Sequence, residues 1–348
     1  MSDPARRFRA GVMLAVSLVL SATLASGEAF GADGETLEAV RERGALGCGV
    51  NPDLPGFSQS NSLGVWSGLD VDLCRAVASA VLDDPGAVEF VPVSATERFE
   101  ALVAGRFDLL ARNTTWTLSR NALHGEFVGV NYYDGQGFMV GRRTGIRSAL
   151  ELDNQSVCVS RGTTTELNAI DFFVASNLRY RPVYYDDGAS AAEGYENGEC
   201  VALTTDRSGL AAFRTGFAEP AAHHVLPEVI SKEPLGPMVR VGDPSWANIV
   251  RWSLACMINA EEMGLTRENV QRGDAATTPA ARRLLGEEDE LGVLLGLDAR
   301  WCARIIRDVG SYAESYARNV GPDTPLALDR GVNQLWTDGG LMYAPPVR

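Results

Sequence analysis

The segment FDLLARNTTWTLSR (107–120) carries side chains that are well suited to binding an anion. A strand predicted at 106–111 ends inside it, and amide, hydroxyl and guanidinium groups follow as far as Arg120. In open α/β sheets, ligands bind in the crevice beyond the carboxyl ends of the strands. Arg120 could hold a carboxylate there through two parallel hydrogen bonds. The alternative is that the hydroxyl groups only cap the next helix and that Arg120 is exposed to solvent.

A second segment, SVCVSRGTTTEL (156–167), repeats this order of a strand followed by polar residues. Gly162 and three threonines open a predicted helix, and a helix N-terminus can bind an anion. A purely structural capping box between Thr163 and Glu166 fits the spacing equally well. Asp206 ends a further predicted strand and could accept hydrogen bonds from an ammonium group, although many such residues only start a turn. A cation, two anion sites and a carboxylate around one cleft would suit a zwitterion.

The composition excludes several other kinds of chemistry. The chain has 348 residues and a formal net charge of −14, which argues against binding to nucleic acid through a basic surface. Lys232 is the only lysine, so Schiff-base and P-loop chemistry would have to depend on a residue that lies in no known motif. The three histidines and six cysteines form no helical zinc motif and no CxxC. We therefore expect no cofactor and no metal.

Strands and helices alternate twice along the chain, and each series is typical of an α/β unit. The first series has predicted strands at 45–50, 88–93 and 106–111, with helices at 69–82 and 97–105. The second has strands at 156–160, 180–185 and 200–206, with helices at 164–177 and around 189–197. Extended segments at 138–141 and 233–241 would leave the first unit and return to it, and helices are predicted at 246–264 and 301–321. Two lobes joined in this way enclose a cleft, a favoured place for a small ligand.

The N-terminus has the order of a secretory signal peptide. Three arginines, at positions 6, 7 and 9, precede an apolar run at 11–25 that is short for a transmembrane helix, and Ala29-Phe30-Gly31 resembles a cleavage site. We expect residues 1–32 to be removed and the mature protein to work in the periplasm. An uncleaved N-terminal anchor is the alternative.

Export would place the six cysteines in an oxidising compartment, where disulfides are plausible. Spacing alone cannot choose among the fifteen possible pairings of six cysteines. Order along the chain favours Cys48–Cys74, Cys158–Cys200 and Cys256–Cys302, because each pair would then lie within one structural unit. Buried free thiols are the alternative, especially for Cys256 and Cys302.

Several motifs resemble those of the periplasmic amino-acid-binding proteins of ABC importers, in particular the general L-amino-acid-binding branch of solute-binding protein family 3. They are RFEALVAGRFDLLARNTTWTLSR, YYDGQGFMV, CVSRGTTTELN, TTDRSGL, ISKEPLGPMVR and LWTDGGLMYAPPVR, and they extend over the mature chain. The resemblance implies a two-lobed type II periplasmic-binding-protein fold, here with a C-terminal helical extension. The expected parts are lobe 1 at 36–139 plus 236–270, lobe 2 at 140–235, and an extension at 271–348 packed on lobe 1.

The resemblance also implies a ligand site. Arg120 and the backbone N–H groups of Thr115 and Thr164 would surround the α-carboxylate of an amino acid. Asn113 and Asp206 would contact its α-ammonium group, Asn113 through its amide oxygen.

Two further positions would contact the ligand side chain. Arg98 matches a position that reaches side-chain carboxylates in proteins that bind acidic amino acids, and a surface arginine is the alternative. Phe57, or Leu54 beside it, would form an apolar wall.

These observations predict a monomeric, non-enzymatic receptor that closes around an L-amino acid and delivers it to an ABC permease. The resemblance also implies broad specificity. A periplasmic dehydratase on the same fold would need a general acid in the cleft, for which Glu97 and Glu166 are candidates. A sensor domain is a third possibility, but the sequence has no recognisable signalling module.

Overall fold

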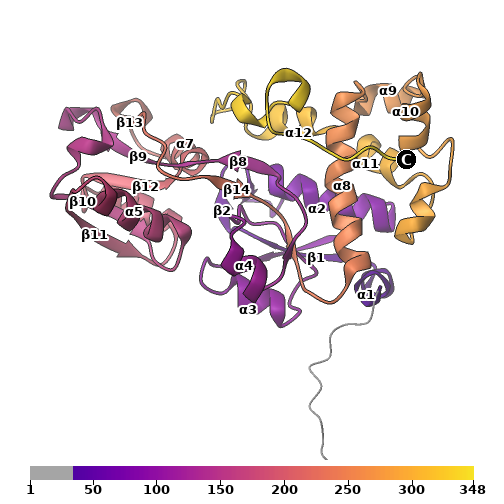
Figure 1. Ribbon diagram of the computed structural model, residues 1–348, viewed down its shortest axis with the longest axis horizontal. Coiled ribbons are helices and arrows are strands. Elements are labelled where there is room, and N and C mark those ends of the chain that lie inside the picture. Colours follow the sequence, from indigo (N-terminus) through magenta and orange to yellow (C-terminus); the bar gives the residue numbers. More distant parts are fainter. Residues whose placement is uncertain (1–33) are drawn as a thin grey trace, which may run out of the picture. The chain divides into compact units, whose positions relative to one another are not determined.

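The structure is a computed structural model that describes residues 34–348. Two five-stranded sheets organise these residues. We call the first sheet, with the helices packed on it, lobe 1, and the second, with its helices, lobe 2 (Figure 1). The signal peptide expected at 1–32 lies outside the described residues. Within residues 34–348, no helix has both the length and the apolar character needed to cross a membrane.

The sheet of lobe 1 has the strand order β5-β1-β6-β15-β7, in which β5, β1 and β6 are parallel and β15 is antiparallel to both of its neighbours. Its strands are β1 (Leu46–Val50), β5 (Val88–Pro92), β6 (Leu109–Leu110), β7 (Glu126–Phe127) and β15 (Met238–Val239). Its helices are α1 (Glu35–Arg43), α2 (Leu69–Leu82), α3 (Arg98–Val103), α4 (Leu118–Leu123) and α8 (Pro244–Glu262). A small sheet of β2 (Asp53–Leu54), β3 (Ser58–Ser60) and β4 (Trp66–Ser67) adjoins α2.

Strand β1 shows why the centre of lobe 1 was predictable from sequence. All five of its residues are buried, as expected for a parallel strand that is covered on both faces. The strand predicted at 106–111 is shorter than expected, because only Leu109 and Leu110 pair in the ladder. Next to them, the Asp108 carboxylate accepts the N–H group of Gly47 at 2.8 Å.

Lobe 2 has the strand order β11-β10-β12-β9-β13. Its elements are β9 (Gln136–Gly141), β10 (Gln155–Ser160), β11 (Tyr180–Tyr185), β12 (Ala202–Asp206), β13 (His223–Val225), α5 (Thr164–Ala175), α6 (Gly188–Glu196), α7 (Arg207–Thr215) and the short 3₁₀ turns η1 (Arg142–Thr144), η2 (Ala149–Glu151) and η3 (Pro220–Ala222). Because β9 pairs with β12 and β13, the expected end of the first segment of lobe 1 at residue 139 is too late. The whole of β9 belongs to the second sheet.

The two lobes are joined by two antiparallel crossover strands, β8 (Tyr132–Asp134) and β14 (Glu233–Leu235). In the register of this ladder, Glu233 lies opposite Asp134 and Leu235 lies opposite Tyr132. A two-stranded connection allows the lobes to rotate relative to each other while the chain remains paired.

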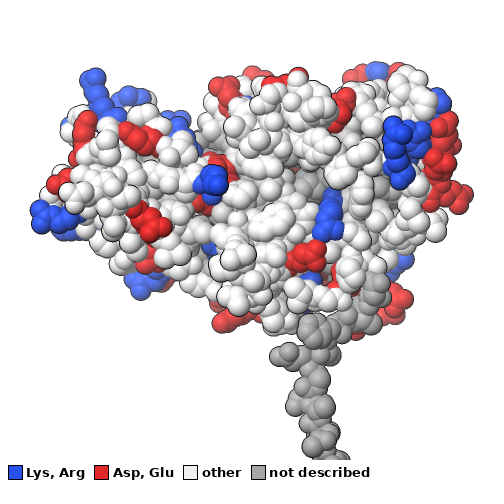
Figure 2. Space-filling view, in the orientation of Figure 1, with Lys and Arg blue, Asp and Glu red and all other residues white. Residues whose placement is uncertain are grey.

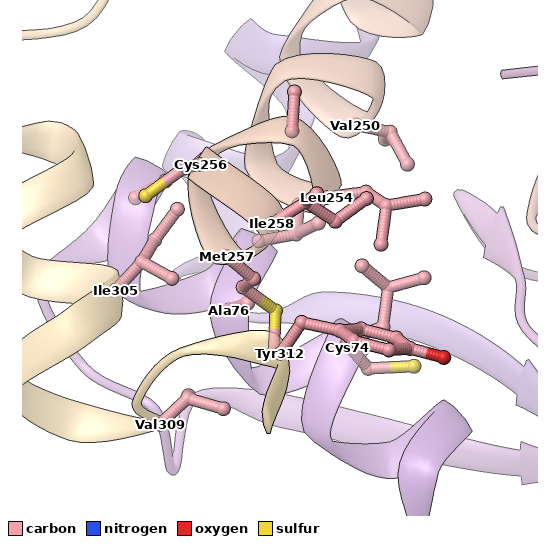
Figure 3. Close-up of a cluster of buried hydrophobic side chains, with 14 of the residues drawn as sticks. Cys74, Ala76, Val250, Leu254, Cys256, Met257, Ile258, Ile305, Val309 and Tyr312 are labelled. Atoms are coloured by element: carbon pink, nitrogen blue, oxygen red, sulfur yellow. The ribbon is translucent and has the colours of Figure 1, made fainter. Parts of the chain in front are cut away.

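The C-terminal region is helical and packs on α8 and α2 of lobe 1. It contains α9 (Arg267–Arg272), α10 (Pro279–Leu284), α11 (Trp301–Asp308), α12 (Tyr312–Asn319) and the 3₁₀ turns η4 (Leu291–Leu295), η5 (Gly331–Asn333) and η6 (Trp336–Asp338). Figure 3 shows Ile305, Val309 and Tyr312 beside Met257 of α8 and Ala76 of α2. These side chains belong to one buried cluster, so the extension completes the core of lobe 1.

All six cysteines are paired, and the predicted order along the chain is confirmed. Cys48–Cys74 links β1 to α2. Cys158–Cys200 links β10 to the segment that leads into β12, since Cys200 lies two residues before that strand. Cys256–Cys302 joins α8 to α11. The alternative of free buried thiols is therefore wrong for every pair.

Candidate functional site

A cavity between the lobes brings together most of the predicted site residues. Its walls come from the ends of β6 and β12, the N-termini of α5, α6 and α7, and the loop after β1. The lining residues are Asn51, Leu54, Ala95, Arg98, Arg112, Asn113, Thr115, Arg120, Ser160, Thr163, Thr164, Thr165, Gly188, Thr205, Asp206, Gly209 and Phe213. Both lobes contribute, so the site is complete only when the lobes meet.

Arg120 lies at this cavity and is almost completely buried. Thr117 does cap helix α4, because its side chain accepts the Arg120 N–H group at 3.2 Å. The guanidinium is nevertheless not exposed, and its Nη1 donates to the Thr115 carbonyl at 2.9 Å. Burial lowers the pKa of Arg120, while the negative charges of Glu233 and Asp206 act in the opposite direction. The capping and binding interpretations of this segment are thus compatible.

The two threonines predicted to bind a carboxylate through their backbone face each other. Thr115 is in lobe 1, Thr164 is the first residue of α5 in lobe 2, and their hydroxyl oxygens are 3.3 Å apart. Within residues 34–348, neither backbone N–H group donates a hydrogen bond. The cap of α5 is also present, since the Thr163 hydroxyl accepts the Glu166 N–H group and the Glu166 carboxylate accepts that of Gly162. The cap leaves the N–H group of Thr164 at the N-terminus of α5 available for an anion, together with that of Thr115 from lobe 1.

Asp206 is the carboxylate of the cavity. It precedes α7 at the N-cap position, yet its side chain accepts no capping hydrogen bond, and no other hydrogen bond or ion pair to it is found in the described part of the chain. Burial raises its pKa well above the usual value, and the neighbouring Asp134 and Glu233 raise it further, whereas Arg120 and Arg98 lower it. A buried carboxylate without a direct partner is costly, which makes it suitable for a cationic group of a ligand.

Three arginines line the cavity, of which Arg98 and Arg120 were expected there from the sequence. Arg98 is 3% exposed and donates to the Ala95 carbonyl, so the alternative of a surface arginine is wrong. The third is Arg112, which donates through Nε to the Val93 carbonyl at 2.8 Å and is 7% exposed. Its position two residues after the end of β6 was the signal that could have found it.

Asn113 has an unusual backbone that a buried carboxylate supports. Its φ of 37° lies in the left-handed region, and its N–H group donates to Asp70 at 2.8 Å. Its side-chain oxygen accepts from Asn51 at 3.1 Å. One lone pair of this oxygen is therefore already used, and the amide N–H₂ group donates no hydrogen bond within the described residues. The expectation that Asn113 contacts an ammonium through its oxygen remains a prediction.

Phe57 is not at the cavity. It is 1% exposed and packs edge-to-face on Tyr132 with ring centroids 5.2 Å apart, so its side chain belongs to the core of lobe 1. Leu54, the other residue considered for the apolar wall, does line the cavity, and Phe213 contributes from lobe 2. Of the two residues expected to form the apolar wall, Leu54 therefore lines this cavity and Phe57 does not.

Glu233 is a residue of this region that the sequence did not reveal. It lies on crossover strand β14, is 1% exposed, and its carboxylate accepts hydrogen bonds from residues of both lobes. The donors are Thr115 Oγ1 at 2.5 Å, Thr164 Oγ1 at 3.4 Å, Asn168 Nδ2 at 2.6 Å and Ser231 Oγ at 2.6 Å. A single carboxylate therefore connects lobe 1, lobe 2 and the crossover, and no spacing in the sequence indicates this role.

The remaining candidates do not build a catalytic centre. Neither Glu97 nor Glu166 lines the cavity. Glu97 is exposed and bonds to Ser94, and Glu166 is used to cap α5. No group of three or more potential metal ligands occurs in residues 34–348. On the face shown in Figure 2, acidic and basic side chains are scattered and no continuous basic surface is visible.

Comparison with known proteins decides the family. Residues 46–270 match the bacterial extracellular solute-binding proteins, family 3. The chain belongs to this family. It is a solute-binding protein of the periplasmic-binding-protein type rather than an enzyme.

Similar proteins cover nearly the whole of this solute-binding protein. It is 46% identical over 336 residues to the general L-amino acid-binding periplasmic protein AapJ of Rhizobium johnstonii. This match covers 96% of this chain and 98% of AapJ. It is 49% identical over 330 residues to the glutamate/glutamine/aspartate/asparagine-binding protein BztA of Rhodobacter capsulatus. This match covers 94% of this chain and 98% of BztA.

A solved structure from Brucella ovis, an ABC transporter/periplasmic binding protein with glutathione bound, superposes on the solute-binding protein with a TM-score of 0.89. The two chains are 49% identical, and the match covers 91% of this chain and all of that one. The predicted family resemblance and the two-lobed type II periplasmic-binding-protein fold are confirmed.

Proposed function

We propose that the cleft captures an L-α-amino acid by binding its α-carboxylate with groups of both lobes and its α-ammonium with a carboxylate of lobe 2. Arg120 and the N–H groups of Thr115 and Thr164 take the α-carboxylate, and Asp206 takes the α-ammonium. The observation that supports this proposal is a buried guanidinium and a buried carboxylate that line one cavity without an ion pair between them. A ligand with both charges would supply the missing partner to each.

The names of the relatives agree with this class of ligand. AapJ is named for general L-amino acids and BztA for glutamate, glutamine, aspartate and asparagine, and the Brucella ovis structure contains glutathione, a peptide with a free amino-acid end. These ligands share an α-carboxylate and an α-ammonium group and differ in the side chain. We therefore expect binding of several amino acids, with Leu54 and Phe213 forming the apolar part of the pocket.

Calorimetric titration of the purified, ligand-free protein with a panel of L-amino acids tests the proposal. We expect micromolar or tighter binding of at least one L-amino acid, and no binding of its D-enantiomer or of the analogue without the α-amino group. The absence of binding for every L-amino acid, or turnover of a prephenate-like substrate, would contradict it.

We further propose that the protein is exported through its N-terminal signal peptide, acts as a monomer and delivers its ligand to the membrane subunits of an ABC permease. Differential affinity of the ligand for the closed state would favour the closed shape that the permease recognises. Mass spectrometry of periplasmic material would locate the mature N-terminus near residue 32, and sedimentation would measure the mass in solution. Stimulation of permease ATPase activity by the liganded protein, but not by the ligand-free protein, would test the partnership.

A further inference from the structure

The C-terminal extension reaches the crossover between the lobes as well as the core of lobe 1. Asn333, the last residue of η5, is 3% exposed, and its side-chain amide bonds to both backbone groups of Tyr133 in β8. Its Oδ1 accepts the Tyr133 N–H group at 2.7 Å, and its Nδ2 donates to the Tyr133 carbonyl at 2.9 Å. In Figure 1 the C-terminal residues, in yellow, lie beside β8. We call this pair of hydrogen bonds the Asn333 clamp, because it holds β8 as a neighbouring strand would.

The clamp lies on the outer edge of the two-stranded crossover. Tyr133 is opposite Pro234 of β14, and a proline has no N–H group to donate. Along an antiparallel ladder, backbone groups alternate between facing the partner strand and facing away from it. Those of Tyr133 face away, toward Asn333, and the Pro234 carbonyl faces away and accepts the N–H group of Trp116 in lobe 1 at 2.8 Å. The pair of Tyr133 and Pro234 is therefore held from both edges.

The clamp is itself anchored on lobe 1. Arg330 donates through Nη2 to the Asn333 carbonyl at 2.7 Å and forms an ion pair with Glu261 of α8 at 3.0 Å. The guanidinium of Arg330 also lies over the ring of Tyr312, 5.2 Å from its centroid. The Tyr312 hydroxyl donates to the carbonyl of Asn131, just before β8, at 2.8 Å. The extension thus binds the start of the crossover strand at two places through a network that is fixed to α8.

The residues that follow in the chain are bound to lobe 2. The Asp134 carboxylate accepts the N–H group of Ser208 in α7 at 3.1 Å. The Gly135 carbonyl accepts the N–H group of Arg207 at 2.9 Å. The contacts of the crossover strand therefore change from lobe 1 to lobe 2 between Tyr133 and Asp134. A rotation of the lobes must be taken up by the backbone dihedrals of a few residues, and this step is where the contacts allow it.

We propose that Asn333 is a positioning residue for closure of the lobes. The clamp keeps Tyr133 on lobe 1 while the cleft opens, and it confines the bend to the residues that follow Tyr133. Without the clamp the bend would spread along β8, because a two-stranded ladder is marginally stable on its own. The open protein would then sample a wider range of lobe positions, and the ligand would have to restrict more motion on closure. The effect on affinity rests on the proposed amino-acid-binding function, whereas the effect on the ligand-free protein does not.

Single-molecule fluorescence energy transfer between dyes on the two lobes tests this inference. Non-natural amino acids at the exposed positions of Glu42 in lobe 1 and Arg143 in lobe 2 carry the dyes and leave the disulfides intact. In Asn333→Ala we expect a broader distribution of distances than in wild type without ligand, and the wild-type distribution with saturating ligand. The ligand is the L-amino acid that binds wild type most tightly in the calorimetric panel, and its dissociation constant should rise about threefold to tenfold. Tyr312→Phe removes only the hydroxyl that bonds to Asn131 and should broaden the ligand-free distribution less.

Asn259→Ala is the matched control. Asn259 is also 3% exposed, and its Nδ2 donates to the Pro345 carbonyl at 2.9 Å, so it joins α8 to the extension without a bond to β8. This variant should unfold at a lower temperature than wild type but keep the wild-type distance distribution and a dissociation constant within about twofold. A purely structural role of Asn333 would give the same result in Asn333→Ala as in this control and would contradict the inference.

The outcomes separate this inference from the proposed function. If wild type binds no L-amino acid, the proposed function fails, while the ligand-free distance distributions still decide the role of Asn333. If these distributions are equally wide in wild type, Asn333→Ala and Tyr312→Phe, the positioning role is wrong even though amino acids bind. Thermal unfolding checks that each variant is folded. If Asn333→Ala does not fold, an unchanged width in Tyr312→Phe alone overturns the inference.

Discussion

The hydroxyl oxygens of Thr115 and Thr164 lie 3.3 Å apart, although one residue belongs to lobe 1 and the other to lobe 2. Both hydroxyls also donate to Glu233 on the crossover strand β14. The structure therefore corresponds to a closed arrangement, in which the two backbone N–H groups proposed to bind one carboxylate are brought to the same place. Closure and the assembly of the anion site are the same event.

Replacement of Glu233 by glutamine should make closure less favourable. The carboxylate accepts four hydrogen bonds, whereas an amide offers one oxygen and turns an N–H₂ group toward the remaining donors. We expect ligand affinity to fall about tenfold to a hundredfold. Each lost hydrogen bond to a buried charged group costs about 1.5–3 kcal/mol, and rearrangement of the neighbouring donors offsets part of this cost. Small-angle scattering should show a smaller ligand-induced compaction than in wild type.

The exposed residue Glu193 provides the control, because Glu193→Gln makes the same chemical change on the surface of α6. An affinity and a compaction equal to wild type in Glu233→Gln would show that the crossover carboxylate does not contribute to closure.

Truncation of Arg120 to alanine should remove the main anchor for the α-carboxylate. Loss of one partner of a buried, hydrogen-bonded charge pair costs about 2–5 kcal/mol, because the other charge stays buried and unpaired. We expect that cost in the affinity for every L-amino acid that binds, measured by calorimetry. Arg143→Ala, at an exposed position, is the matched control. A loss below tenfold in Arg120→Ala would mean that the carboxylate anchor has been assigned to the wrong residue.

Strand ends explain why the sequence pointed to Arg120 and Asp206. Asp206 is the last residue of β12, and Arg120 ends the polar segment that follows β6, and ligands in open α/β sheets bind beyond such strand ends. The alternation of buried strands with amphipathic helices likewise predicts two α/β lobes, and pairing of cysteines within each unit follows from chain order. What the pattern could not give is the direction of a side chain in a short hairpin. Phe57 and Leu54 are three residues apart, and only Leu54 faces the cavity.

Contacts between segments that are distant along the chain were the second feature that the sequence could not predict. Glu233 lies in an extended crossover where nothing in the local sequence distinguishes a buried hydrogen-bond acceptor from a solvated glutamate. Its donors Thr115 and Thr164 are more than sixty residues away along the chain. Arg112 directly precedes the polar run, but its burial and its hydrogen bond to the Val93 carbonyl come from tertiary packing. Tertiary packing, rather than local propensity, decides both cases.

Replacement of Asp206 by asparagine should change affinity and stability in opposite directions. Asparagine cannot pair with the ligand ammonium as a charge, so affinity should fall at least tenfold at neutral pH. The ligand-free protein should become more stable, because the ionised Asp206 is buried and repelled by Asp134 and Glu233. Calorimetry and thermal unfolding measure the two effects, and a loss of stability in Asp206→Asn would contradict this account of the site.

The pH dependence of binding follows from the same carboxylate. Because the pKa of Asp206 is raised in the ligand-free protein, a fall in pH through this raised pKa protonates Asp206 before an exposed aspartate would be protonated. Only the ionised form pairs with an ammonium group, so affinity should decrease as the pH falls, and binding in that range should release a proton. The same slope should be weaker in Asp206→Asn. The free energy of unfolding of the ligand-free protein should change with pH in the opposite direction to the affinity. Because the pKa of Asp206 is raised by folding, the ligand-free fold loses stability as the pH rises from the usual aspartate pKa to the raised one.

Removal of the Cys158–Cys200 disulfide should destabilise lobe 2 without weakening ligand binding in the folded protein. The bond ties β10 to the start of β12, its cysteines are separated by 42 residues, and neither cysteine lines the cavity. For a loop of that length, the chain-entropy model gives about 4 kcal/mol, because the cross-link limits the unfolded chain. Urea unfolding of the double Cys158→Ala, Cys200→Ala variant should show this loss in the free energy of unfolding. Calorimetry below the transition should give the wild-type dissociation constant. A free energy of unfolding within about 1 kcal/mol of wild type would indicate that the disulfide leaves the unfolded state unconstrained.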